Sequence, residues 1–121
     1  MKVYTFGHPR LANKAFDDAL TNQVKDAYRV VHWKDLVAHV PPCIAKPVVG
    51  KSSCLTDGTL SPIYPFHTMT EVFYTEDESS YEVCSTMEQR SCSNQFLLGN
   101  VENHLVYFGI QVGQASKTPI S

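Results

Sequence analysis

The chain has 121 residues, enough for one domain and too few for two. Hydrophobic residues make up 43% and charged residues 18%, a balance that fits a packed globule and disfavours disorder or collagen-like repeats. The net charge of −2 lacks the basic excess of a nucleic-acid-binding protein, and no apolar run reaches the roughly 18 residues of a membrane span, so neither a nucleic-acid partner nor a transmembrane segment is expected.

A strand, a helix and a second strand are predicted in the first 32 residues. Residues 3–6 are a short β-prone run, typical of a buried strand, which Gly7-His8-Pro9 ends. Apolar residues then recur at the three- and four-residue steps of an amphipathic helix: Ala12, Ala15, Phe16, Ala19, Leu20 and Val24. Polar residues occupy the opposite face: Asp17, Asp18, Asn22 and Lys25. Residues 27–32 are again β-prone, so the segment predicts a βαβ unit with two parallel strands.

A proline-rich loop, a hairpin and a last helix are predicted in the remainder. Residues 34–65 show no regular pattern, and a loop of that length calls for a cross-link or a function. Residues 67–74 and 81–84 flank an acidic turn and predict a β-hairpin. Residues 100–110 carry Val101, Leu105 and Phe108 on one helical stripe. We therefore expect one α/β domain over residues 1–113 and a frayed polar tail over residues 114–121.

The four cysteines, Cys43, Cys54, Cys84 and Cys92, suggest two disulfides and an oxidising compartment. Pairing Cys43 with Cys54 and Cys84 with Cys92 is favoured because each bond would close one loop between elements, although the sequence leaves three connectivities open. None of the cysteines has C-x-x-C spacing, and His8, His32 and His39 lack the spacing of metal ligands. We expect neither a metal nor a cofactor.

Asp35 and His104 are the candidate catalytic residues. Asp35 follows the predicted second strand by a few residues, at the edge where parallel sheets display functional side chains. His104 comes later, near the start of the last predicted helix. An Asp followed by a His is the order in which α/β-hydrolases supply the second and third members of a Ser-Asp-His triad. Each residue alone would suit an ordinary loop or surface position.

Several short motifs extend this pattern along the chain. They are TFGHPR at 5–10 with Asn13, YRVVH at 28–32, Asp35 with HVPP at 39–42, His67 with EVFY at 71–74, and His104 with YFG at 107–109. In this order they resemble the carboxy-terminal half of the class 3, or fungal-type, lipases of the α/β-hydrolase superfamily. The resemblance covers residues 3 to about 110. It implies the C-terminal portion of an α/β-hydrolase with an incomplete sheet: parallel strands with a crossover helix, a β-hairpin and a C-terminal helix.

The resemblance also implies roles for single residues. Asp35 matches the triad aspartate and His104 the triad histidine, while His67 matches a structural position. The segment with Cys84 and Cys92 resembles a disulfide-closed loop of the family. Ala12 replaces a family glycine, and the family's V-P-x-L differs at residues 38–40; both changes concern backbone shape more than chemistry. The implied substrate of the complete enzyme is a lipid ester such as a triacylglycerol.

The nucleophilic serine of the family is missing from these residues. Family members carry it in a G-x-S-x-G turn upstream of the strand that reads YTFG, and no serine here has that context. Ser52 lies in a segment without the second glycine, and Ala45 rules out a phosphate-binding loop there. We therefore expect a C-terminal fragment that lacks the serine and the oxyanion hole and is inactive alone.

Two other interpretations remain open. The chain could be a non-catalytic lipid- or protein-binding module on a lipase scaffold. It could also be a small secreted, disulfide-stapled domain unrelated to hydrolases, in which Asp35 and His104 would lie far apart. The cysteines and the resemblance favour an extracellular location, although the first residues show no signal peptide. Lipid class, acyl-chain length and oligomeric state are not encoded in any motif.

Overall fold

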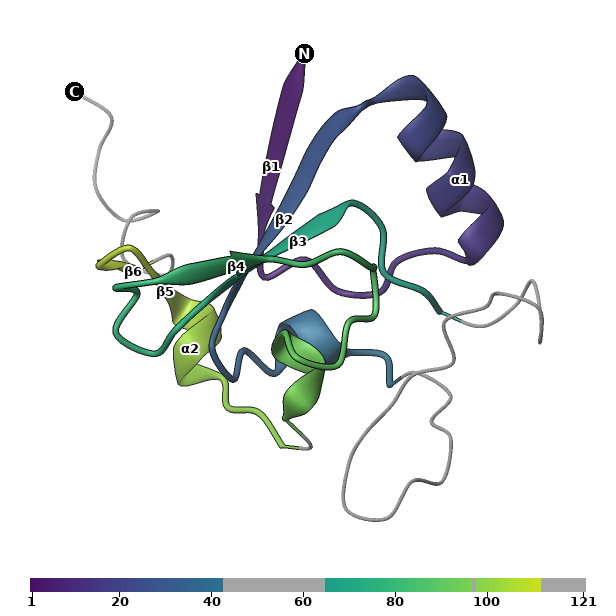
Figure 1. Cartoon of the computed structure of the whole chain (residues 1–121). Helices are drawn as coiled ribbons and strands as arrows, with labels where there is room; N and C mark the ends of the chain where they lie inside the picture. Colours follow the sequence, from purple (N-terminus) through teal and green to yellow (C-terminus); the bar gives the residue numbers. More distant parts are fainter. Residues whose placement is uncertain (43–64, 97, 112–121) are drawn as a thin grey trace, which may run out of the picture.

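A four-stranded mixed sheet organises the computed structural model, which describes residues 1–42, 65–96 and 98–111 (Figure 1). Strands β1 (Lys2–Phe6), β2 (Asp26–His32) and β3 (Thr70–Tyr74) are parallel, and β4 (Tyr81–Val83) pairs antiparallel with β3. The order is β1-β2-β3-β4, so β2 and β3 lie inside. The βαβ unit and the hairpin are both confirmed.

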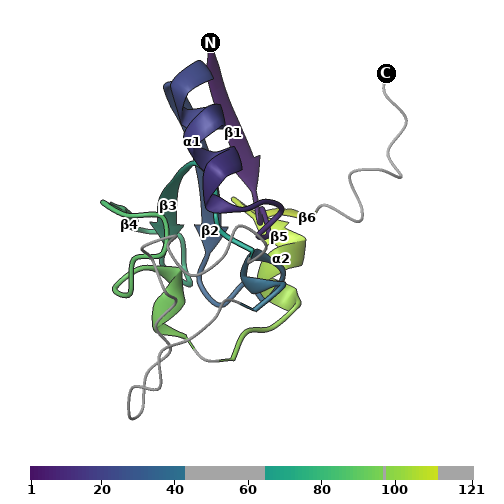
Figure 2. The ribbon, with the colours of Figure 1, turned by 90° about the vertical axis from the view of Figure 1, so that its right-hand side faces the viewer.

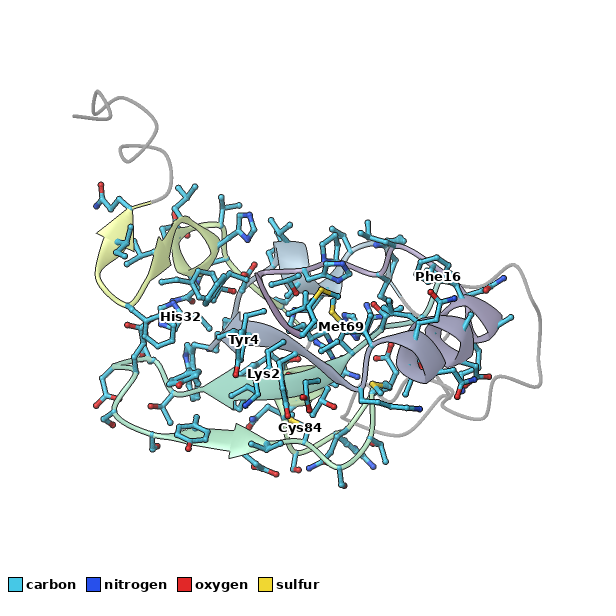
Figure 3. The ribbon with its side chains drawn as sticks, turned by 90° about the horizontal axis from the view of Figure 1, so that it is seen from above. Lys2, Tyr4, Phe16, His32, Met69 and Cys84 are labelled. Atoms are coloured by element: carbon cyan, nitrogen blue, oxygen red, sulfur yellow. A yellow bond between two sulfur atoms is a disulfide. The ribbon has the colours of Figure 1, made fainter. Side chains whose placement is uncertain are left out.

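Helix α1 (Lys14–Gln23) connects β1 to β2. Asn13 begins it, because its side chain accepts the backbone N–H of Phe16 at 3.0 Å. The apolar spacing does not mark the most buried side chain of the helix: Phe16 is 55% exposed and points outward (Figure 3), whereas Asp17 is buried. The expectation of a buried first strand is wrong, since β1 is an edge strand whose residues are alternately exposed and half-buried.

The core lies between β2, β3 and the segments that follow them. Its buried members are Val31, Ala38, Phe73, Cys84 and Cys92. Trp33 and Phe96 pack against this cluster with their ring centroids 4.7 Å apart. The predicted Cys84–Cys92 disulfide is present and ties the end of β4 to the short helix η2 (Ser93–Gln95). Cys43 and Cys54 lie outside the described residues.

The last segment differs from the helix predicted over residues 100–110. Helix α2 spans only Glu102–Leu105, and β5 (Val106–Tyr107) and β6 (Ile110–Gln111) then form a small hairpin. The helix ends where Val106 adopts an extended conformation, and Phe108 at φ 52° and Gly109 at φ 73° form the two-residue turn of the hairpin. The predicted tail over residues 114–121 lies outside the described residues. Among those described, no helix is long and apolar enough to cross a membrane.

The segment that precedes α2 lies against the chain that leaves the end of β2. In Figures 1 and 2, α1 lies beside the start of β2, whereas α2, β5 and β6 lie near the opposite end of that strand. The chain leaves β2 through Trp33 and enters the short helix η1 (Val37–His39). The backbones of Asp35 and Asn100 pair in an isolated bridge, which brings the segment before α2 against the end of β2.

Candidate functional site

Asp35 lies just beyond the carboxyl end of β2 and is completely buried. Its Oδ1 accepts the backbone N–H groups of Val37 at 2.9 Å and of Ala38 at 3.2 Å, at the start of η1. The N–H of Leu36 donates to the carbonyl oxygen of Asn100 at 3.0 Å. These bonds fix the carboxylate and leave its second oxygen, Oδ2, for other partners.

His104 of α2 meets that second oxygen. Its Nδ1 lies 3.0 Å from Oδ2 of Asp35, and its side chain is 31% exposed. Because Nδ1 faces Asp35, Nε2 is the ring nitrogen that remains for a proton transfer, on a side chain that is partly exposed and lines an open cavity. The alternative in which Asp35 and His104 lie far apart is therefore wrong. A buried carboxylate against one nitrogen, with the second nitrogen left for proton transfer, is the arrangement of a general base with its orienting acid.

Tyr107 of β5 is a third member that the sequence analysis missed. Its hydroxyl donates to Oδ2 of Asp35 at 2.5 Å and accepts the backbone N–H of His32 at 3.2 Å. Burial and the negative charge of Asp35 raise the pKa of Tyr107 far above its ordinary value, so its hydroxyl remains a donor. Tyr107 was visible in the YFG motif, but nothing in the sequence indicated that its hydroxyl reaches Asp35.

Gly7 allows Asp35 and His104 to approach the end of β1. A Cβ at this position would lie 2.5 Å from Nδ1 of His104 and 2.7 Å from Oδ2 of Asp35. Gly7 also adopts φ +60°, in the left-handed region that favours glycine. The glycine of the TFG motif is therefore needed for steric reasons, because any side chain at this position would collide with Asp35 and His104.

An open apolar cavity of about 390 Å³ adjoins His104. It is lined by Phe6, His104, Tyr107, Phe108 and Ile110. The ring of Phe6 meets the rings of Tyr107 and Phe108 edge to face, with centroids 5.6 and 6.2 Å apart. Such a surface can hold hydrocarbon beside the imidazole.

Arg10 supports the loop that carries Asp35. Its guanidinium donates to the carbonyl oxygen of His39 at 2.6 Å and forms a buried ion pair with Glu88 at 2.9 Å. His39 closes η1, whose first N–H groups hold Asp35. Arg10 therefore links the connection between β1 and α1 to the loop that carries Asp35. Its place in the TFGHPR motif did not indicate this role.

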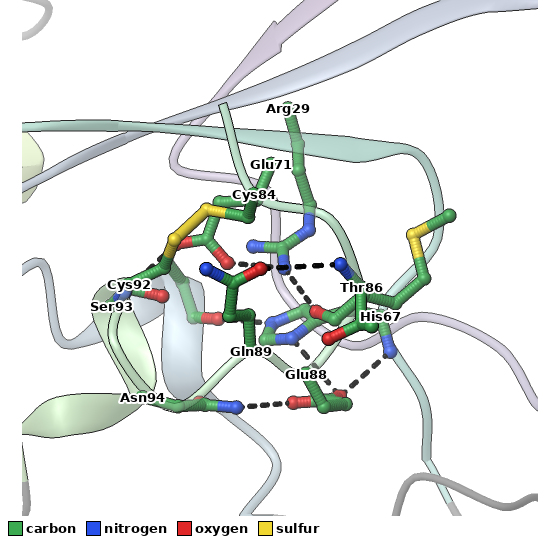
Figure 4. A network of polar contacts seen from close by, with 12 residues as sticks. Arg29, His67, Glu71, Cys84, Thr86, Glu88, Gln89, Cys92, Ser93 and Asn94 are labelled. Carbon is green, nitrogen blue, oxygen red and sulfur yellow. Dashed lines mark hydrogen bonds and ion pairs between the residues drawn. A yellow bond between two sulfur atoms is a disulfide. The ribbon is translucent and has the colours of Figure 1, made fainter. Parts of the chain in front are cut away.

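His67 lies in a separate buried cluster (Figure 4). Its Nε2 donates to the carbonyl oxygen of Ala38 at 2.7 Å, whereas its Nδ1 lies 3.1 Å from Oε1 of Glu88 without forming a hydrogen bond, so one N–H group suffices for this ring. Burial and the neighbouring Arg29 guanidinium lower the pKa of His67 to about 4. Burial raises the pKa of Glu88, but contacts with His67 and Arg10 outweigh burial and hold it well below its usual range. This cluster stabilises the fold around the site, in keeping with the structural position expected for His67.

A second buried ion pair lies beneath the disulfide (Figure 4). Arg29 of β2 donates to Oε2 of Glu71 in β3 at 2.6 Å, and both side chains are fully buried. Glu71 also lies near Cys84 and Cys92, the one group of potential metal ligands among the described residues. Both sulfurs are in the disulfide, so they cannot bind a metal as thiolates.

Comparison with known proteins agrees with the geometry. The family model for class 3 lipases matches residues 1–45. A lipase of Caenorhabditis elegans is 29% identical over 97% of this chain and 38% of its own length. The lipase of Rhizomucor miehei is 29% identical over 92% of this chain and 26% of its own length. A secreted mono- and diacylglycerol lipase of Fusarium solani is 26% identical over 88% of this chain and 28% of its own length.

Solved structures give the same result. A triacylglycerol lipase described as having a serine protease triad at its catalytic centre superimposes with a TM-score of 0.69 and 28% identity, covering 93% of this chain and 37% of that one. The propeptide complex of Rhizomucor miehei lipase also gives 0.69, with 27% identity over 93% of this chain and 31% of that one. The chain thus spans well under half the length of these relatives. In sequence it is similar to class 3 lipases, and its architecture matches the α/β-hydrolase fold of these solved lipases.

Proposed function

We propose that the protein is an ester hydrolase acting on lipids and that Asp35 and His104 are two members of its Ser-His-Asp triad. The observation that carries this proposal is the 3.0 Å contact between Nδ1 of His104 and the buried carboxylate of Asp35. The apolar cavity beside His104 supports a substrate with a hydrocarbon part. The relatives named as lipases support an ester as the reacting group.

In the proposed reaction, Nε2 of His104 takes the proton of a serine hydroxyl while the serine oxygen bonds to the ester carbonyl carbon. The same proton passes to the alcohol that leaves. Water then attacks the acyl-enzyme, again with His104 as base, and releases the carboxylic acid and the serine. Asp35 holds Nδ1–H throughout and stabilises the imidazolium, while Gly7 leaves space for both side chains.

We further propose that the serine and the oxyanion hole lie outside these 121 residues, which contain no G-x-S-x-G motif. On this proposal the 121 residues alone do not turn over an ester. The Cys84–Cys92 disulfide, and a relative that is named as secreted, support an extracellular location.

A serine-directed phosphonate probe tests the proposal. The purified 121-residue chain should remain unlabelled, whereas a version extended upstream through a G-x-S-x-G turn should be labelled and should hydrolyse lipid esters. Asp35→Asn in the extended version should lower kcat by about 10³- to 10⁴-fold, because the imidazole loses its orienting acid. His104→Ala should be at least as damaging.

Asp18→Asn is the matched control, because Asp18 lies on the exposed face of α1, and its activity should equal that of the wild type. Labelling of the 121-residue chain together with ester turnover would contradict the fragment proposal. An extended chain with neither labelling nor turnover would favour a non-catalytic module on a lipase scaffold.

A further inference from the structure

His32 joins three parts of the chain at the end of β2. It is almost completely buried and lies beside the α2–β5 segment (Figure 3). Its Nδ1 lies 2.9 Å from the carbonyl oxygen of Val106 and 3.2 Å from that of Asn103. Its Nε2 lies 2.9 Å from the carbonyl oxygen of Glu76, in the turn between β3 and β4. Both ring nitrogens therefore face oxygens that can only accept.

This geometry requires two N–H donors on one ring. A neutral imidazole has one N–H group and one lone pair, and a lone pair 2.9 Å from a carbonyl oxygen is repulsive. Only the imidazolium satisfies Val106 and Glu76 together.

The surroundings of the ring suit a positive charge. Oε1 of Glu78 lies 3.8 Å from Nδ1, and the same carboxylate oxygen accepts the N–H of Phe108 at 2.8 Å. Among the described residues, the ring of Tyr107 in β5 packs edge to face against the imidazole, and Tyr74 is the strand partner of His32 in β3. Burial lowers the pKa of His32, but the three carbonyl groups and Glu78 outweigh burial and raise it above 6.5.

His32 also holds the residues that meet Asp35. Its imidazole contacts the carbonyl groups of Asn103 and Val106, which flank His104 in the chain. Its backbone N–H donates to the hydroxyl of Tyr107, which in turn donates to Asp35. We propose that His32, as an imidazolium, is a positioning residue that ties the segment of residues 103–107 to β2 and to the β3–β4 turn, so that His104 and Tyr107 both reach Asp35.

The consequence for catalysis rests on the proposed function, whereas the tie itself can be measured without turnover. Because the pKa of His32 is raised, the tie is complete below pH 6.5 and is lost as pH rises through the raised value. Deprotonation leaves a lone pair facing a carbonyl oxygen, so residues 103–107 should then open more often.

The first experiment uses the unaltered chain. Side-chain nitrogen NMR across a pH titration should show His32 predominantly doubly protonated at pH 6.5. Above its midpoint the amides of residues 103–107 should exchange about tenfold faster or more, after correction for intrinsic base catalysis. A neutral His32 at pH 6.5 would overturn the proposal, as would a titration of His32 that leaves these amides unchanged.

The second experiment compares two histidine variants. His32→Gln removes the charge and one of the two donors, so the exchange midpoint in residues 103–107 should disappear and their exchange should be fast at every pH. His8→Gln is the control, because His8 lies in the β1–α1 connection and contributes nothing to the tie; its midpoint should match the wild type. A midpoint retained in His32→Gln, or lost in His8→Gln, would contradict the assignment.

The catalytic consequence is measured separately in the extended, phosphonate-reactive protein. His32→Gln should lower kcat there and remove an alkaline fall in rate that coincides with the NMR midpoint of His32. If the NMR prediction holds and this protein shows no lipase activity, the proposed function fails while the positioning role of His32 stands. If activity is present and the NMR prediction fails, the proposed function stands while the positioning role of His32 fails.

Discussion

Adding a single methyl group at Gly7 should displace the catalytic pair proposed above. Gly7→Ala would place a Cβ 2.5 Å from His104 and 2.7 Å from Asp35, so the imidazole and the carboxylate must both shift away from residue 7. A displacement of about 1 Å in a catalytic group can cost about 100-fold in rate, and phosphonate labelling of the extended protein should slow by about that factor.

Gly109→Ala is the matched control for this prediction. Gly109 also has a positive φ, +73°, but a Cβ there would meet nothing within 4 Å. Both variants should lose about 1 kcal/mol or more of unfolding free energy to backbone strain in urea titrations. Only Gly7→Ala should lose labelling; equal labelling rates in the two variants would contradict the steric role of Gly7.

The contact between Asp35 and His104 was predictable, because each residue stands in a motif that is local in the sequence. Tyr107 and His32 stand in the same motifs, but their roles depend on contacts across 72 and 74 residues of chain. Side-chain identity alone does not distinguish a buried tyrosine that binds a carboxylate from one that fills space. Hydrogen-bond partners of that kind come only from the fold.

Among the elements, α1 offers a clear test of local stability. Asn13→Ala removes the side-chain oxygen that accepts the N–H of Phe16 and leaves that donor at the helix start without this bond. The free energy of unfolding should fall by about 1 kcal/mol, measured by urea titration. Asn22→Ala changes an exposed residue within the same helix and should have little effect or a slightly stabilising one. An equal loss of unfolding free energy in both variants would mean that the loss in Asn13→Ala does not come from the missing helix cap.

The element scale also shows which sequence patterns were sufficient. Strand periodicity and turn residues predicted the βαβ unit and the β3–β4 hairpin, because both depend on neighbouring residues. The helical stripe over residues 100–110 misled, since the chain is extended from Val106 and turns back at Phe108 and Gly109 to pair β5 with β6. The spacing of apolar residues also did not indicate which side chain of α1 is buried: Asp17 packs inward while Phe16 faces outward, which tertiary packing decides.

For the whole molecule, the unexpected feature is the amount of buried charge. Arg10 pairs with Glu88 across 78 residues, and Arg29 pairs with Glu71 across 42. All four side chains are buried, so loss of any one partner leaves an uncompensated charge in the interior. Composition could not reveal these pairs, because ten basic and twelve acidic residues fit an ordinary solvated surface equally well.

His67 connects this buried charge to the pH dependence of stability. Its pKa is lowered from 6.5 to about 4, first by burial and then by Arg29. Between about pH 6.5 and pH 4 the unfolded chain therefore binds a proton that the folded chain does not, and the free energy of unfolding should fall as pH falls through this window. The expected loss is about 3 kcal/mol in total, measured by urea titration at several pH values.

The variant His67→Gln should lose less stability across that window, because it removes the group that takes up the proton in the unfolded state. His8, whose pKa burial also lowers, contributes a slope of the same sign in both proteins, so the difference between wild type and variant is the informative quantity. His32→Gln is the control, since the raised pKa of His32 acts above pH 6.5 and should leave the acid window unchanged. If the variant does not fold, NMR titration of His67 in the wild type decides, and a midpoint near 6.5 would contradict the prediction.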